Sequence, residues 1–402
     1  MNTKESFIID AVRTPIGKFG GMLSSIRADD LAAHTIKALM SQCDIDMSQI
    51  DDVILGCANQ AGEDNRNVAR MALLLAGLPF TVPGETVNRL CASGMSAAIH
   101  AHRAIQSGDG ELFIAGGVES MTRGPWVISK TSTPFGRDSK MEDTSFGWRF
   151  INPKLQEIYG TESMGQTAEN VAEKYKISRE EQDNFAYHSQ MKATIAQKEG
   201  TFKSEIAAID IPQRKSDPLK FTEDEFVKPH TTIERLEKLK AAFKKEGSVT
   251  AGNSSGLNDG AAVMLIASEK GVNSHNLTPI ARIVSSAVVG VEPRIMGIGP
   301  VEASNKALKK AGFVMKDMDI IELNEAFSAQ SIACIRQWEL ADDDPRINPN
   351  GGSIALGHPL GMSGARIMQT AAMELQRSEK KYALATMCVG VGQGYAVIIE
   401  KV

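Results

Sequence analysis

Short apolar runs alternate with segments of helical periodicity along the first 120 residues. The runs FIIDAVRT (7–14) and DDVILGCANQ (51–60) are short and apolar, so they predict buried strands. Residues 29–43 repeat apolar side chains at helical spacing, and SGMSAAIHAHRAIQSGDG (93–110) predicts a helix that ends in glycine. The run ELFIAGGVESM (111–121) predicts a further strand. Strands that alternate with helices indicate an α/β fold.

The pattern changes between residues 122 and 250. Residues 122–160 are rich in turn-forming and aromatic residues and have no sustained period, and a charged helical segment follows at 168–200. The charged run TIERLEKLKAAFKKEG (232–247) predicts a mostly solvated helix or turn. Long irregular segments in compact proteins are usually functional, so we expect an inserted loop or lid domain here.

After residue 250 the first pattern returns. Residues 300–337 parallel residues 28–62, with an amphipathic helix, a polar linker, an apolar strand and a polar turn in the same order. Residues 347–394 parallel residues 87–120 in the same way. We therefore predict two copies of one unit that face each other, with a site at their junction.

A chain of 402 residues exceeds what a single core usually fills, which also favours two units. We place the boundaries as follows: residues 1–121 form the first part of the N-terminal half, 122–250 the lid, 251–275 the return to the N-terminal half, and 276–402 the C-terminal half.

Composition and charge narrow the function classes. With 42% apolar and 23% charged residues and a formal charge of −5, the chain is an ordinary globular protein without the basic surface that nucleic acid needs. No uncharged apolar stretch approaches the ~18 residues of a membrane span. The first 21 residues carry an acidic side chain and a short apolar run, unlike a secretory signal. We expect neither nucleic acid nor membrane as a partner, and a cytoplasmic location.

Five cysteines, an odd number, are widely spaced and form no CxxC pair. This pattern argues against a disulfide framework and a zinc site, so we predict no metal and a reducing compartment. Cys91, in VNRLCASGMS, stands out because a helix would begin there, and the positive end of a helix stabilises a thiolate and lowers the thiol pKa. Small neighbours leave room for a substrate. The alternative is a small buried hydrophobe, which is common for free cysteine.

Two glycine-rich segments hold further candidates. His358 lies in NPNGGSIALGHPLGMSGA (348–365), where Pro359 fixes the chain directly after the imidazole, and it is a candidate base or oxyanion donor. Cys388 ends an apolar strand before the Gly-x-Gly-x-Gly turn of CVGVGQG (388–394). A dinucleotide fingerprint would continue into a helix, but this chain returns to a strand, so we expect backbone N–H groups and a thiol at a site.

In these segments the chain resembles the thiolases, which cleave or form 3-ketoacyl-CoA by Claisen chemistry. The resemblance runs nearly end to end, through DAVRTPIGKFGG, VNRLCASGM, AGGVESMT, SVTAGNSSGLNDGAA, ELNEAFSAQ, NPNGGSIALGHPLGMSGAR and CVGVGQG. It implies a duplicated α/β/α/β/α five-layer core with an inserted lid. It also implies a homo-oligomer, either dimer or tetramer, with coenzyme A as co-substrate and no permanently bound cofactor.

The resemblance assigns roles to the candidates. Cys91 would be the nucleophile of an acyl-enzyme, ping-pong mechanism, His358 its activator, and Cys388 the second thiol acting as acid and base. Attack on the keto carbon and departure of the enolate each place negative charge on an oxygen, so the mechanism requires two oxyanion holes. The N–H groups of Cys91 and Gly390 would form one, and His358 with Asn324, acting through a water, the other.

The family pattern also implies a CoA and substrate pocket, in which Ser255 and Met164 contact the pantetheine arm. Lys228 stands where relatives often carry Arg, which suggests a phosphate or adenine contact. For each apolar residue of this pocket, the alternative role is packing in the core. The remaining members are Leu239, Phe243 and Ala251 on the path toward the adenine, and Phe327 at the acyl end.

The resemblance favours a degradative thiolase over an acetoacetyl-CoA thiolase working in the condensing direction, because Ser163 replaces the His that biosynthetic relatives carry before Met-Gly. Residues 141–164 resemble the loop of bacterial β-ketoadipyl-CoA thiolases of aromatic degradation, which release succinyl-CoA and acetyl-CoA. A broad 3-ketoacyl-CoA thiolase of fatty acid β-oxidation stays open. A dicarboxylate substrate would want a cation near the acyl pocket, and the loop offers Arg123, Arg137, Lys140 and Arg149.

Three other classes remain as alternatives. A ketoacyl synthase-like condensing enzyme would use histidines or His/Asn where this chain has Cys388. A non-catalytic acyl-CoA carrier would be expected to lack one of the reactive groups. A cysteine hydrolase would release free acid without CoA.

Overall fold

The N-terminal half is built around five neighbouring strands in a computed structural model that describes residues 4–402. β1 (Ser6–Arg13) and β5 (Leu112–Ser120) each pair antiparallel with β10 (Asn258–Ser268), and β5 runs parallel to β3 (Asp52–Gly56). β4 (Gly84–Val87) pairs parallel with β3 at the edge. Every residue of β5 and β10 is buried, because helices cover both faces of the sheet.

The C-terminal half repeats this arrangement. β11 (Ala281–Gly290) and β13 (Tyr382–Val389) each pair antiparallel with β14 (Gln393–Lys401), and β13 runs parallel to β12 (Ile320–Leu323). A parallel bridge between Ile321 and Ile347 takes the place of the fifth strand. The order and the directions match those of the first half, which confirms the predicted duplication.

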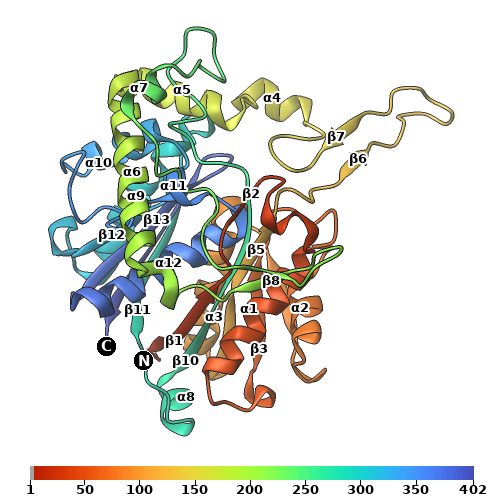
Figure 1. Ribbon diagram of the computed structural model, residues 1–402, viewed down its shortest axis with the longest axis vertical. Coiled ribbons are helices and arrows are strands. Elements are labelled where there is room, and N and C mark those ends of the chain that lie inside the picture. The colour runs from red at the N-terminus through yellow and green to blue at the C-terminus, as the bar shows by residue number, and fades with distance from the viewer. Residues whose placement is uncertain (1–3) are drawn as a thin grey trace.

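Two helices form the central layer. α3 (Ser93–Ser107) and α12 (Leu360–Ser378) share one buried apolar cluster with strands of both halves. The helices cross closely near their N-terminal ends, where a Cβ atom on Gly94 would lie 2.6 Å from the carbonyl oxygen of Gly361. Figure 1 shows α12 at the centre, with β11 and β13 on one side and α3 and β5 on the other.

Two further layers of helices cover the outer faces. α1 (Ala28–Gln42) and α2 (Val68–Ala76) bury their apolar side chains on the first half-sheet, and α9 (Gly299–Ala311) and α10 (Ser328–Gln337) do the same on the second. The predicted five-layer α/β/α/β/α order is therefore confirmed. The half-sheets also meet edge to edge, through two antiparallel pairs between β1 and β11.

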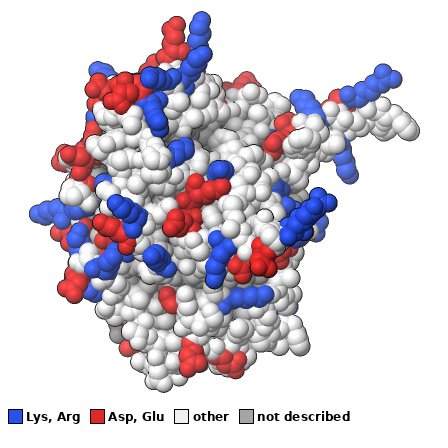
Figure 2. All heavy atoms as spheres, viewed as in Figure 1, with Lys and Arg blue, Asp and Glu red and all other residues white. Residues whose placement is uncertain are grey.

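The segment between β5 and β10 forms a separate cover. β6 (Trp126–Ile128) and β7 (Met141–Asp143) make a hairpin that projects from the body, at the upper right of Figure 1. In Figure 2 this arm carries Lys and Arg atoms beside uncharged surface. The predicted charged helix at 168–200 is α5 (Met164–Tyr175) and α6 (Arg179–Glu199). Shorter elements are β2 (Gly17–Lys18), α4 (Pro153–Tyr159), β8 (Ile209–Ile211), β9 (Leu219–Phe221), α7 (Ile233–Glu237), α8 (Glu269–Ser274) and α11 (Ser353–Leu356).

The run 232–247 contains only the five-residue helix α7, and turns follow it. A buried ion-pair cluster ties the cover to the body, because the fully buried Arg13 guanidinium on β1 lies 2.9 Å from Glu205 and 2.7 Å from Asp224. The boundaries between the four predicted segments stay a prediction. Among residues 4–402, no helix is long and apolar enough to cross a bilayer.

Candidate active site

The central feature of the site is a cavity of about 450 Å³ that reaches the N-terminal ends of α3 and α12. Its lining is largely apolar, with a few polar groups, as is usual for ligand pockets. Both halves and the cover contribute to it. The residues expected from the sequence that line this cavity are Cys91, Met164, Lys228, Phe243, Ala251, Ser255, Phe327, His358 and Cys388.

Cys91 lies in a single 3-10 turn, Leu90–Ala92, directly before α3. The backbone N–H groups of Gly390 and of Cys91 itself act to lower the pKa of the Cys91 thiol. The expected lowering of the thiol pKa is wrong, because burial raises the pKa of Cys91 to about 11 and outweighs both effects. The Cys91 thiol is therefore protonated near pH 7, and it could act as a nucleophile only if a base took its proton.

His358 is held by the backbone on both sides. Gly357 has a φ of +105°, and a Cβ atom there would lie 2.5 Å from Cγ of Asn258, so only glycine fits. The N–H of His358 donates to Oδ1 of Asn258 at 3.0 Å, and Pro359 is the N-cap of α12. These constraints aim the imidazole into the cavity.

The hydrogen bonds of His358 select its tautomer. The Ser363 hydroxyl donates to the carbonyl of Pro359 at 2.8 Å, so its oxygen accepts the Nδ1–H of His358 at 2.6 Å. Nε2 therefore keeps its lone pair and can take a proton. Burial lowers the pKa of His358 to about 3, so the imidazole is neutral at physiological pH and available as a base.

Asn324 lies beside this imidazole, with Nδ2 3.5 Å from Nε2 of His358. The Ser353 hydroxyl donates to Oδ1 of Asn324 at 2.6 Å, which turns the amide N–H groups toward the imidazole. Arg366 donates to the Ser353 oxygen at 3.2 Å and forms a buried ion pair with Glu322 at 3.3 Å. Asn324 is thus fixed beside the base, although it does not line the cavity.

Cys388 is the penultimate residue of β13, and a short turn leads from β13 into β14. The turn needs left-handed backbone at Val391 (φ +61°) and Gly392 (φ +81°). The predicted strand return is confirmed, and no helix follows that could form a dinucleotide site. Burial and the nearby Cys91 raise the pKa of the Cys388 thiol, so it is protonated and can serve as an acid.

Lys228 lies between the cavity and the surface. It lines both the large cavity and an outer groove of about 500 Å³, which also holds Leu239 and Ala251. Its Nζ lies 4.3 Å from the ring centroid of Phe226, and burial lowers its pKa. Leu239 therefore belongs to the outer groove and not to the inner cavity.

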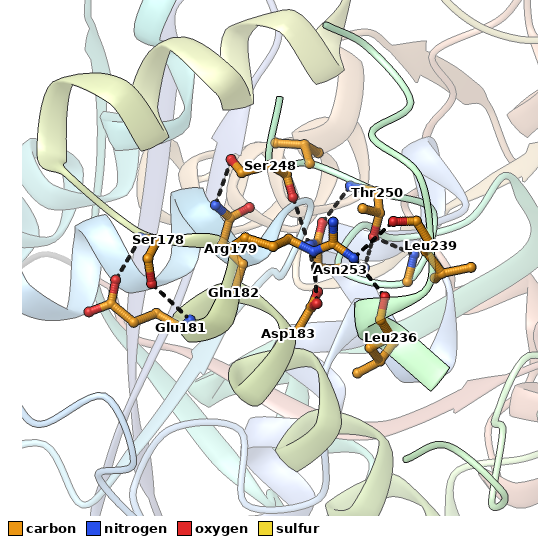
Figure 3. A network of polar contacts seen from close by, with 12 residues as sticks. Ser178, Arg179, Glu181, Gln182, Asp183, Leu236, Leu239, Ser248, Thr250 and Asn253 are labelled. Atoms are coloured by element: carbon orange, nitrogen blue, oxygen red, sulfur yellow. Dashed lines mark hydrogen bonds and ion pairs between the residues drawn. The ribbon is translucent and has the colours of Figure 1, made fainter. Parts of the chain in front are cut away.

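A polar network fixes the loop that carries Ala251 and Ser255 (Figure 3). Arg179 on α6 donates to Asp183 at 2.7 Å and to the carbonyls of Leu236 and Leu239 at 2.6 and 3.1 Å. Asp183 in turn accepts from Nδ2 of Asn253 at 2.9 Å. One helix of the cover thus positions the end of α7 and the loop 248–255.

Several groups that support the site could not be identified from sequence patterns. Ser363 and Asn258 hold His358, and Glu119 accepts the N–H groups of Ala58, Asn59 and Gly361 at 2.8–3.0 Å. Burial raises the pKa of Glu119 to about 7. Glu119 and Asn258 lie within the family blocks of the sequence, but their partners come from distant segments, so their roles could be identified only from the fold.

Polar atoms of Cys57, Asp64 and Glu119 lie within 4.8 Å of one another, a spacing that could suit a metal ion. Backbone N–H groups already donate to both Glu119 oxygens, however.

The four cations that the sequence offered for a dicarboxylate substrate differ in their pairing and exposure. Arg123 pairs with Glu63 at 2.5 Å, Arg137 and Lys140 are exposed on the hairpin, and Arg149 lines a second cavity that contains Cys91. Ser163 forms a capping box with Gln166 at the start of α5.

Comparison with known proteins agrees with this geometry. The family models described as thiolase N-terminal domain and thiolase C-terminal domain match residues 6–270 and 277–401. The beta-ketoadipyl-CoA thiolase of Acinetobacter baylyi is 57% identical, covering 99% of this chain and 100% of the relative. The 3-oxoadipyl-CoA/3-oxo-5,6-dehydrosuberyl-CoA thiolase of Escherichia coli K12 is 56% identical with the same coverage.

Solved structures give the same result. Human mitochondrial 3-ketoacyl-CoA thiolase superposes with a TM-score of 0.93 at 42% identity, with 100% of both chains covered. Its complex with CoA gives 0.92 at 42% identity, covering 100% of this chain and 98% of the other. The chain is an acyltransferase and belongs to the thiolase family.

Proposed function

We propose that this protein is a degradative thiolase that cleaves 3-oxoadipyl-CoA with CoA to succinyl-CoA and acetyl-CoA. The observation that carries this proposal is the meeting of Cys91, His358 and Cys388 around one cavity. The names of the relatives that are 55–57% identical over the full chain support the choice of substrate.

The geometry supports a two-stage mechanism. The Cys91 thiol attacks the C3 keto carbon while its proton passes to Nε2 of His358, which the Ser363 bond leaves unprotonated. The tetrahedral oxygen lies between the N–H groups of Cys91 and Gly390. The C2–C3 bond then breaks, and its electrons form the enolate of acetyl-CoA. The Cys388 thiol protonates C2, which completes acetyl-CoA.

The second stage returns the enzyme to its resting state. The Cys388 thiolate takes the proton of an incoming CoA thiol, and the CoA sulfur attacks the acyl-Cys91 thioester. The acyl group leaves as succinyl-CoA, and His358 returns the proton to Cys91. Earlier, while the enolate exists in the first stage, the N–H of the protonated imidazole, with Asn324 acting through a water, would hold its thioester oxygen.

CoA serves as co-substrate in this scheme, and we propose no permanently bound cofactor. The pantetheine arm would lie along Met164, Ser255, Phe243 and Ala251, with Phe327 at the inner, acyl end. Lys228 and Leu239 would meet the adenine and phosphate portion in the outer groove, where a desolvated ammonium suits a phosphate.

We also propose a homo-oligomer, either dimer or tetramer, in the cytoplasm. The projecting hairpin exposes Trp126, Ile128, Phe135 and Met141, and β4 lies at an edge of the sheet. Five free cysteines suit a reducing compartment.

The test is CoA-dependent loss of acetoacetyl-, 3-oxohexanoyl-, 3-oxodecanoyl- and 3-oxoadipyl-CoA. We expect 3-oxoadipyl-CoA to be preferred and Cys91→Ala to lower kcat by at least about 10³-fold, because it removes the nucleophile. The matched control is Cys43→Ala, which replaces a free cysteine at the end of α1 and should keep full activity.

Other outcomes identify other enzymes. Graded activity on neutral chains would indicate a β-oxidation thiolase, and activity on acetoacetyl-CoA alone an acetoacetyl-CoA thiolase. Release of free acid without CoA would indicate a hydrolase. If no substrate is turned over, or if Cys91→Ala is as active as the parent, the proposal is wrong.

A further inference from the structure

A second cavity, of about 260 Å³, meets the large cavity at the nucleophile. Cys91, Met164, Phe146 and Leu360 line both cavities. In the substrate, the thioester arm and the rest of the acyl chain lie on opposite sides of the C3 carbon that Cys91 attacks. If the pantetheine arm fills the large cavity, the second cavity is open to the acyl chain beyond C3.

The charged side chain in the lining of this second cavity is Arg149. Other arginines nearby are already paired, Arg123 with Glu63 at 2.5 Å and Arg294 with Glu162 at 2.6 Å. Across residues 4–402, by contrast, no carboxylate lies within ion-pair distance of the Arg149 guanidinium. A half-buried, unpaired guanidinium beside a nucleophile is suited to an anionic group of the substrate.

The neighbouring residues fix the position of Arg149. Gly147 turns the chain with a φ of +85°, and the indole N–H of Trp148 donates to the carbonyl of Glu162 at 3.2 Å. Glu162 immediately precedes the N-cap of α5, the helix that begins with the cavity residue Met164. The loop that carries Arg149 is thereby tied to the wall of the acyl site.

We propose that Arg149 binds the distal carboxylate of a 3-oxodicarboxylyl-CoA and thereby selects dicarboxylate over neutral acyl chains. This inference rests on the proposed function and names the group that sets its substrate class. In 3-oxoadipyl-CoA the carboxylate carbon lies three bonds beyond the attacked C3, so a cation must stand close to Cys91. Arg149 lines the same cavity of about 260 Å³ as Cys91, whereas Arg137 and Lys140 lie on the exposed hairpin.

The experiment compares two substrates of equal chain length, 3-oxoadipyl-CoA and the neutral 3-oxohexanoyl-CoA, on the full-length protein. For Arg149→Met we expect kcat/KM on 3-oxoadipyl-CoA to fall about 10- to 100-fold, in line with the loss of a charged hydrogen bond. On 3-oxohexanoyl-CoA it should change less than about twofold, and the KM for CoA should not change. Arg149→Lys should recover only part of the loss, because Lys cannot bind the carboxylate in a bidentate manner.

Arg137→Met is the control, since it removes an exposed cation of the same segment. An equal loss on both substrates, or no loss on 3-oxoadipyl-CoA, would overturn the role of Arg149 while leaving the thiolase function intact. Failure of the proposed function itself is distinguishable, because then the parent protein would cleave neither substrate or Cys91→Ala would remain active.

Discussion

At the residue scale, the resting site holds its reacting groups uncharged. Burial raises the pKa of Cys91 to about 11 and lowers that of His358 to about 3, so at pH 7 a thiol faces a neutral imidazole. A raised thiol pKa means that the thiolate is the minor form at every pH below about 11. Charge develops only when the substrate arrives.

Alkylation of Cys91 by iodoacetamide tests this state. Because only the thiolate reacts, we expect its rate in the free enzyme to rise about tenfold per pH unit from pH 7 to 9 without levelling. Peptide mass spectrometry would follow Cys91 separately from the half-exposed Cys43. A rate that reaches a plateau near pH 7 would instead show a stable thiolate and would restore the expectation drawn from the helix start.

That Cys91, His358 and Cys388 belong to one site could be predicted from the sequence, and all three line the same cavity, but their ionisation could not be predicted. Cys91, His358 and Cys388 are each marked by adjoining glycines at the end of an apolar segment. Desolvation depends on every segment packed around a group, and these segments come from both halves of the chain. The Ser363 bond was missed for a related reason, since nothing in HPLGMS reveals which way its hydroxyl points.

At the element scale, the cover positions the loop 248–255, which we propose binds CoA, through α6. Arg179 holds the carbonyls of Leu236 and Leu239, and its partner Asp183 holds Asn253 in the loop 248–255. We expect Arg179→Met to raise the KM for CoA about 10-fold or more, as the loss of a charged hydrogen-bond network worth ~1.5–3 kcal/mol implies. kcat should change much less, because none of these groups meets the reacting atoms.

Steady-state kinetics with varied CoA would separate the two parameters. Lys244→Met is a suitable control, since its ion pair with Glu173 is exposed and contributes little. A fall in kcat with an unchanged KM for CoA would contradict a positioning role.

The helices of this network were predicted from their periodicity, but α7 proved much shorter than the charged run 232–247, because charge alone does not set where a helix ends.

At the scale of the whole molecule, the two halves were recognisable as a repeat because the four central strands and the main helices of one half have counterparts in the other. The parallel holds for the linkers too, where a short 3-10 turn precedes both β3 and β12. The antiparallel join of β1 to β11 carries no sequence signal, since it depends only on how the halves dock.

The hairpin of β6 and β7 leads to the last prediction, which concerns assembly. It exposes Trp126 (69%) and Ile128 (68%) on an arm that the body of the molecule does not cover, and such apolar surface is costly for a monomer. We expect light scattering to give a mass that is a multiple of 43.3 kDa, and Trp126→Ser with Ile128→Thr to lower it.

The matched control is Val314→Ser, which removes a similarly exposed apolar side chain (51%) from the body. It should leave the mass unchanged, because an isolated apolar side chain on a surface is common. The arm variant should still cleave 3-ketoacyl-CoA, since neither residue lines the cavities that contain Cys91. A parent mass of 43.3 kDa at micromolar concentration would contradict the assembly. If the arm variant forms the same oligomer as the parent, the interface lies on another surface, such as the open edge of β4.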